Sequence, residues 1–189
     1  TCLADGMRES SKIHFVERAA VPPVLDGRLD DPVWKSARPI TDFGPCGHTP
    51  RAAVVAKTEV RYLWDDKYLY VGTICHEDTP ENFRNFMTEQ LNRDKVVYAR
   101  DCIEVHIDGN NDGHTRFQSW LNGTGDKQII WHYDFGWGLL TDDNYGLNAD
   151  WDYQVFIDEK NLTWTCEARY ALAHIEVKPR AGYVFGIET

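Results

Sequence analysis

The feature that most constrains the fold is a strict alternation of apolar and polar residues over positions 102–108. The apolar parity consists of Ile103, Val105 and Ile107, and the polar parity consists of Cys102, Glu104, His106 and Asp108. A period of two is typical of a half-buried β-strand, because successive side chains point to opposite faces. We therefore predict one strand over residues 96–108, with one face in the core and a polar face that is equipped for binding.

Short strand patterns recur along the rest of the chain. They cover residues 59–64, 68–75, 117–121, 127–133, 151–157, 162–170 and 183–188, and turn-forming Asp, Asn and Gly residues separate them. The sequence has neither a long helical period nor strands alternating with helices. It therefore predicts an all-β fold, an antiparallel β-sandwich or barrel with short helical turns only.

The flanking segments are less regular. We expect residues 1–20 to be a lead-in that contributes one strand around positions 13–16, and residues 21–189 to form a single domain. Asp26 and Gly27 predict a turn, and Asp31 with Pro32 predicts the N-cap and first residue of a short helical turn anchored by Trp34. Residues 77–95 and 134–150 are predicted to be loops.

Composition excludes several classes of partner. The formal net charge of −10 would repel phosphate backbones and anionic lipids, so nucleic acid is not an expected partner. No run reaches the roughly 20 apolar residues of a membrane span. The five cysteines lack zinc or haem spacing, and Cys75 and Cys166 are predicted to be buried thiols rather than a disulfide. The 13% aromatic residues leave a surplus for contact with a neutral ligand.

Glu104 is the centre of the candidate site. Tyr98 and Arg100 lie just upstream on the same parity, which makes a dense polar and aromatic cluster for a structural strand. The alternative is that Glu104 is a solvated strand residue or the partner of Arg100 or Lys127. No nucleophile elbow, phosphate loop or zinc-protease motif occurs, so the sequence predicts a binding module and not an enzyme.

Five blocks in order, at residues 24–37, 63–71, 101–108, 122–125 and 164–167, carry a resemblance. On these blocks the sequence resembles the family 9 carbohydrate-binding modules and the wider DOMON-like group of immunoglobulin-like β-sandwiches. The resemblance implies a non-catalytic module that binds a sugar or a polysaccharide end between aromatic walls and accompanies a glycoside hydrolase or a glycan-uptake system. It implies an extracellular, periplasmic or cell-surface location, and no required cofactor apart from the structural calcium often bound in the family.

The resemblance also implies site residues. Tyr98 falls on the family's aromatic wall, and Glu104 falls on its sugar-binding carboxylate. The next strand offers two parities, one with Gln118, Trp120 and Asn122 and the other with Phe117, Ser119 and Leu121. The family's last strand and second wall would come about 35 residues beyond Thr189, so we expect the clamp to be incomplete or closed by Trp137 or Trp151.

Three further hypotheses remain open. Asp108, Asn110 and Asp112 copy the opening of a calcium loop, but position twelve is Ser119 where a bidentate Glu would be needed, which favours a polar turn. Some DOMON-like domains hold b-type haem through a Met paired with His or Lys, which would here be Met87 with His76 or His106. A third alternative is an accessory domain of a glycosidase whose catalytic part lies outside this chain.

Overall fold

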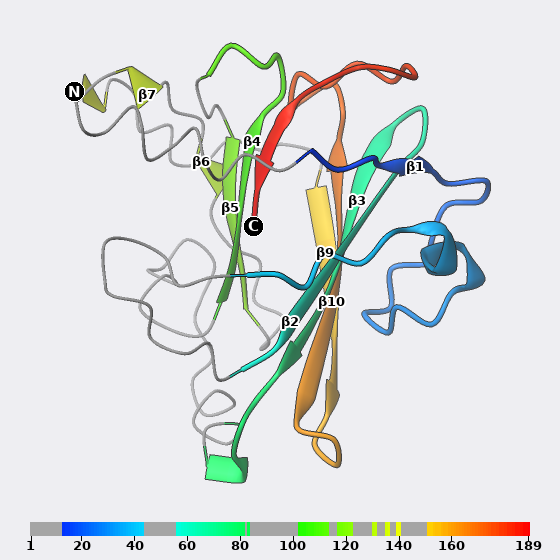
Figure 1. Cartoon of the computed structure of the whole chain (residues 1–189), viewed down its shortest axis with the longest axis vertical. Helices are drawn as coiled ribbons and strands as arrows, with labels where there is room; N and C mark the ends of the chain where they lie inside the picture. Colours follow the sequence, from blue (N-terminus) through cyan, green and yellow to red (C-terminus); the bar gives the residue numbers. More distant parts are fainter. Residues whose placement is uncertain are drawn as a thin grey trace.

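The structure of the chain is a computed structural model, shown in Figure 1, and it describes residues 13–43, 56–81, 83, 102–113, 117–122, 130–131, 135–136, 139–140 and 151–189. Within these ranges most strands form two facing sheets. One sheet has the order β1 (Glu17–Arg18), β2 (Thr58–Trp64), β3 (Tyr68–His76), β10 (Thr163–Ala171) and β9 (Trp151–Asp158). The other has the order β11 (Gly186–Glu188), β4 (Cys102–Asp108), β5 (Phe117–Asn122) and β6 (Ile130–Trp131). The predicted antiparallel β-sandwich is therefore confirmed.

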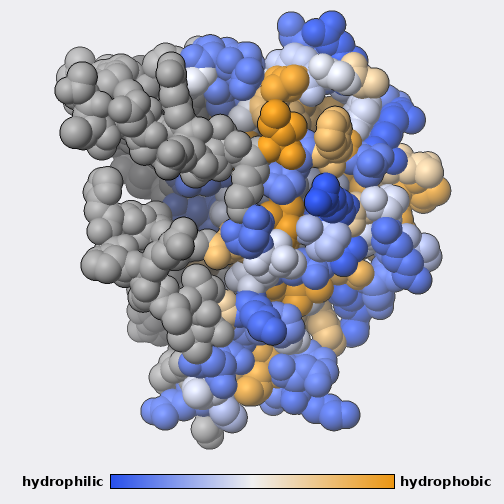
Figure 2. Space-filling model, in the orientation of Figure 1, coloured by the Kyte–Doolittle hydropathy of each residue, from blue (hydrophilic) through white to orange (hydrophobic). Residues whose placement is uncertain are grey.

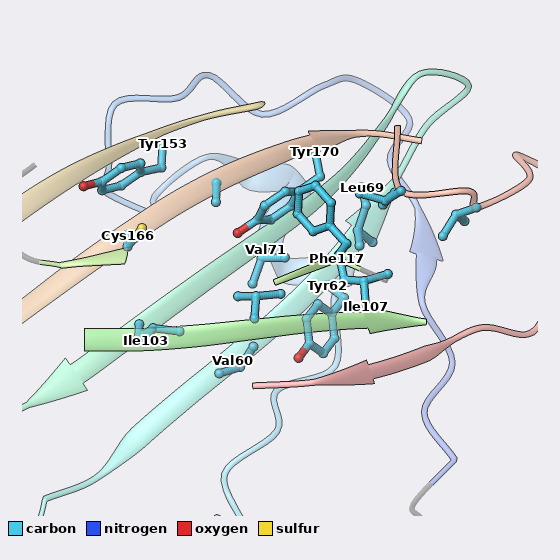
Figure 3. Close-up of a cluster of buried hydrophobic side chains, with 14 of the residues drawn as sticks. Val60, Tyr62, Leu69, Val71, Ile103, Ile107, Phe117, Tyr153, Cys166 and Tyr170 are labelled. Atoms are coloured by element: carbon cyan, nitrogen blue, oxygen red, sulfur yellow. The ribbon is translucent and has the colours of Figure 1, made fainter. Parts of the chain in front are cut away.

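The main core lies between the two sheets (Figure 3). The apolar parity of β4 meets alternate residues of β2, β3 and β10, as the period of two predicts. Phe117 packs edge-on against Tyr170, with ring centroids 5.6 Å apart. The Tyr170 hydroxyl lies 2.8 Å from Ser119 Oγ, so a buried hydrogen bond also joins the sheets. This packing directs the opposite parity of β4 away from the core.

The other face of the five-stranded sheet is covered by residues 19–37. This segment carries the 3₁₀ helix η1 (Pro32–Ser36), which lies on the side of that sheet away from β4 and β5 (Figure 1). Trp34, 2% exposed, packs there with Leu63 and Tyr70. Arg61 Nη1 donates to the carbonyls of Trp34 and Ala37 at 3.0 and 3.2 Å, which satisfies acceptors at the end of η1.

Glu167 joins this covering segment to the sheet. Its Oε2 accepts from the backbone N–H groups of Asp26 and Gly27 at 2.9 and 2.8 Å, and its Oε1 accepts from Trp34 Nε1 at 2.7 Å. Gly27 has φ +85°, and a Cβ there would lie 2.5 Å from the carbonyl carbon of Val155. The predicted Asp26-Gly27 turn is thus confirmed, and it is held against the sheet by a buried carboxylate.

The predicted hairpins are confirmed within one or two residues. The pairs β2–β3 and β9–β10 match the expected strands, and Asp158 closes the second turn by accepting from the backbone of Lys160 and Asn161 at 3.1 Å. Pro32 begins η1 as expected. However, the side chain of Asp31 makes no cap hydrogen bond, and its Oδ2 instead accepts from Val24 N at 2.7 Å.

Two expectations about strands are wrong. The N-terminal strand lies at Glu17–Arg18 rather than around positions 13–16, because only there does the backbone pair with Leu63 and Trp64 of β2, in parallel. Ile13 and Phe15 are instead exposed. Residues 134–150 are not wholly a loop, since β7 (Phe135–Gly136) pairs with β8 (Leu139–Leu140).

The exposed apolar residues of the described part are few. Cys75 and Cys166 are buried thiols, as predicted. In Figure 2 the hydrophobic residues of the visible side appear as separate groups among hydrophilic ones, as is usual for a protein surface. In the described ranges no helix is long and apolar enough to cross a membrane.

Candidate functional site

The outward face of the four-stranded sheet gathers the polar parity of β4 with one parity of β5. In the antiparallel register, Cys102, Glu104 and His106 lie opposite Asn122, Trp120 and Gln118 respectively. Residues directly opposite each other share a face of the sheet. The register thus selects between the two parities that the sequence left open. Positions 118, 120 and 122 share the face of Glu104, while Phe117 and Ser119 are buried on the core side.

Glu104 lies at the middle of this face. Its Oε2 is 3.1 Å from His106 Nε2, and the side chains are 42% and 23% exposed respectively. Arg100 and Lys127, the partners considered from sequence, lie outside the described residues. Within the described residues the carboxylate pairs with His106, two residues along the strand, and much of its surface is in contact with solvent.

Two further positions on this face were missed by the sequence reasoning. β11 pairs with β4 so that the exposed Glu188 lies opposite His106, and β6 pairs with β5 so that position 131 lies opposite Gln118. The pattern at residues 183–188 did predict a strand, although the strand begins only at Gly186. It could not predict which strand would pair with it, because antiparallel partners far apart in sequence leave no local signal.

Several candidate residues lie outside the described residues or are described only by their strand positions. Tyr98, Arg100 and Trp137 are outside the described residues, and for Gln118, Trp120 and Asn122 only the strand positions are described. Trp151, the other tryptophan considered for closing the clamp, lies in β9 of the opposite sheet. It stacks there on Tyr170 at a centroid distance of 5.9 Å and 4° between planes, so it belongs to the core packing.

The turn after β4 is closed by its own side chains. Asp108 Oδ2 accepts from Gly113 N at 2.8 Å, and its Oδ1 accepts from Asp112 N at 3.2 Å. Asn110 Nδ2 donates to Asp112 Oδ2 at 3.0 Å. These bonds satisfy the polar turn that the sequence favoured. Among the residues described, no group of three or more His, Cys, Asp or Glu is arranged to hold a metal ion, and calcium at Asp108, Asn110 and Asp112 stays a prediction.

The haem alternative involves widely separated elements. His76 ends β3 in the five-stranded sheet, whereas His106 lies on the outward face of the other sheet. Met87, which would have to pair with one of them, lies outside the described residues. Because the alternative needs Met87 with only one of the two histidines, it stays a prediction.

Comparison with known proteins identifies the family of the chain. The family model described as carbohydrate family 9 binding domain-like matches residues 25–189. Endo-1,4-beta-xylanase A of Thermoanaerobacterium saccharolyticum is 29% identical over 146 residues, which is 76% of this chain and 11% of that protein. Exoglucanase XynX of Acetivibrio thermocellus is 29% identical over 152 residues, or 76% of this chain and 12% of that protein. The chain thus spans about a tenth of the length of these relatives.

Solved structures show the same fold. A family 9 carbohydrate-binding module from Caldicellulosiruptor kristjanssonii in complex with cellotriose superposes with a TM-score of 0.56 at 17% identity, covering 91% of this chain and 73% of that chain. A structure in complex with glucose gives a TM-score of 0.52 at 18% identity, covering 91% and 74%. Identities this low support a shared fold and nothing further. The match of the family model over residues 25–189 carries the assignment, and the chain belongs to the carbohydrate family 9 binding domain-like family.

Proposed function

We propose that the chain is a non-catalytic carbohydrate-binding module whose site is the outward face of the four-stranded sheet. The observation that carries this proposal is the placement of Glu104, a half-exposed carboxylate on a strand face that the core packing turns away from the opposite sheet. Positions 118, 120 and 122 extend the same face across β5. These positions add an amide, an indole and a second amide by sequence.

The chemistry of these residue types suits a pyranose. A sugar ring offers an apolar C–H face for aromatic stacking and an equatorial fringe of hydroxyl groups that both donate and accept hydrogen bonds. Glu104 would accept from hydroxyl groups, and Trp120 with Tyr98 would supply stacking surface. Arg100, Gln118 and Asn122 would add donors around the ring. A charge-assisted hydrogen bond of this kind contributes roughly 1.5–3 kcal/mol where water is excluded.

The relatives support a proposal for the ligand class. The printed names of the similar proteins include xylanases and an exoglucanase, and the similar solved structures hold cellotriose or glucose. We therefore propose the ends of β-linked glucan or xylan chains as ligands. A glycoside hydrolase domain in the same protein, and an extracellular, periplasmic or cell-surface location, fit this use. Trp137 remains a candidate for closing the clamp.

Titration calorimetry tests the proposal. The wild-type chain is titrated with glucose, cellotriose and xylotriose, with and without calcium, beside Glu104→Ala and Tyr98→Ala. Saturable binding that both substitutions weaken by about tenfold or more is expected. An effect of calcium that disappears in Asp108→Ala would place the ion at the turn after β4.

A matched control uses a second carboxylate. Glu159 is exposed in the turn between β9 and β10, on the opposite sheet, so Glu159→Ala removes the same charge without touching the proposed face. It should leave the affinity unchanged. Binding that ignores Glu104→Ala, or a folded wild type that binds none of these sugars, would contradict the proposed site and the proposed function respectively.

A further inference from the structure

We propose that His106 is a positioning residue that fixes the Glu104 carboxylate for sugar recognition, and this inference rests on the proposed function. The two residues lie two positions apart on β4, so their side chains emerge next to each other on the outward face. His106 Nε2 and Glu104 Oε2 are 3.1 Å apart, which is within hydrogen-bond distance.

The direction of this hydrogen bond follows from the chemistry of the two groups. An ionised carboxylate has only acceptor sites, so the imidazole nitrogen that faces it must carry a hydrogen. His106 therefore donates through Nε2, and the bond uses one acceptor site on Oε2. Oε1 and the remaining site on Oε2 stay available for sugar hydroxyl groups, because the Glu104 side chain is 42% exposed.

The difference in burial makes His106 the anchor of the pair. At 23% exposed its ring is more enclosed than the Glu104 side chain, which without a partner would sample several rotamers. Holding a flexible side chain in its bound geometry before the ligand arrives reduces the ordering cost of binding. Loss of this restraint should weaken sugar binding roughly 3- to 10-fold, a smaller effect than removal of the carboxylate itself.

The neighbours of His106 supply an internal control. Glu188 of β11 lies opposite His106 in the register, on the side away from β5, and is exposed. The carboxylate that lies within hydrogen-bond distance of His106 Nε2 is that of Glu104, at 3.1 Å. Glu188→Gln therefore measures a charge effect of this face, whereas positioning of Glu104 is measured by comparing His106→Ala in the wild-type and Glu104→Ala backgrounds.

A double-mutant cycle by titration calorimetry separates positioning from a structural role. His106→Ala should weaken the binding of cellotriose about 3- to 10-fold in the wild-type background and have little effect in the Glu104→Ala background. His106→Gln should retain most of the affinity, because its terminal amide can also donate to Oε2. His14→Ala, which changes an exposed histidine outside the site, should bind like the wild type.

A second measurement needs no sugar. Long-range ¹H–¹⁵N NMR spectra of the free chain at alkaline pH, where imidazoles are generally neutral, should show His106 protonated at Nε2. An unprotonated Nε2, or an effect of His106→Ala that persists undiminished in Glu104→Ala, would contradict the positioning role of His106. Neither result would contradict the proposed function. A wild type that binds sugar and loses affinity in Glu104→Ala but not in His106→Ala would also contradict the positioning role alone. Absence of sugar binding by the wild type would remove the proposed function, and the inference with it.

Discussion

Glu167 and Glu104 lie on the outer faces of different sheets, and the two glutamates are held in different ways. Glu167 on β10 is 1% exposed and accepts three hydrogen bonds, two from a backbone turn and one from Trp34. Glu104 on β4 is 42% exposed and accepts one from a neighbouring side chain. The fold uses three of the roughly four acceptor sites of the first carboxylate, whereas the second keeps most of its acceptor sites open toward solvent.

The difference comes from what covers each face. Residues 19–37 cross the outer face of the five-stranded sheet and bury Glu167 beneath a turn and η1. On the described part of the other sheet, Glu104 and His106 stay partly exposed. The same residue type on the same kind of strand therefore serves stability on one face and is available for recognition on the other.

The largest expected effect is on stability. Glu167→Ala leaves the N–H groups of Asp26 and Gly27 and the Trp34 indole without their acceptor in a buried site. We expect the free energy of unfolding to fall by roughly 3–5 kcal/mol, measured by urea denaturation. A loss below about 1 kcal/mol would contradict the structural role of Glu167, because Glu167 would then not hold the covering segment. Sugar affinity, measured where the variant is still folded, should be unchanged.

Gly27, in the Asp26-Gly27 turn of that segment, gives the next largest effect on stability. Gly27→Ala combines a positive φ of 85° with a Cβ that would lie 2.5 Å from the Val155 carbonyl carbon, so we expect a loss of roughly 2–4 kcal/mol. Gly113→Ala is the matched control, since Gly113 has φ +88° and nothing within 4 Å of its added Cβ. It should lose only about 1–2 kcal/mol. Equal losses would mean that the close packing against β9 contributes nothing.

Glu104→Ala should show the reverse pattern. We expect sugar affinity to fall roughly 10- to 100-fold, while the free energy of unfolding changes by less than about 0.5 kcal/mol because the side chain is partly solvated. Calorimetry and urea denaturation of the same protein stock measure both quantities. A large loss of stability with unchanged affinity would assign Glu104 the structural role that Glu167 has.

The smallest effect is a pH dependence. Burial raises the pKa of Glu167 above its ordinary value of 4.5, although the hydrogen bonds from Asp26, Trp34 and Gly27 oppose the rise. Between 4.5 and the raised value the folded chain binds more protons than the unfolded chain, so this group's contribution to stability falls as pH increases. The stability of the wild type relative to Glu167→Gln should therefore decline as pH rises above about 4.5. Urea midpoints from pH 4 to pH 8 measure it, and a difference that stays constant or increases would contradict the sign.

The sequence predicted the strands that are long enough to show a clear two-residue period. The alternation at residues 102–108 identified β4 and its polar face, and similar patterns identified β2, β3, β9 and β10. Two-residue strands such as β7 and β8 are too short to show a period, so they were assigned to a loop.

The candidate site was predictable only in part for the same reason. Glu104 could be chosen from its parity and from the family resemblance, but the contact with His106 and the approach of Glu188 depend on rotamers and on strand pairing. The role of Glu167 was hidden because its parity on β10 is that of a solvent-facing residue. Only the non-local packing of residues 19–37 makes that position buried.

Chemical-shift mapping with a ¹⁵N-labelled chain and cellotriose is the most direct test of whether the sugar binds the outward face of the four-stranded sheet. We expect the largest perturbations on β4 and β5, around Glu104, His106 and position 118. Glu167 and the residues of its turn should not shift. Perturbations concentrated on the five-stranded sheet, with β4 unchanged, would contradict the assignment of recognition to one face and stability to the other.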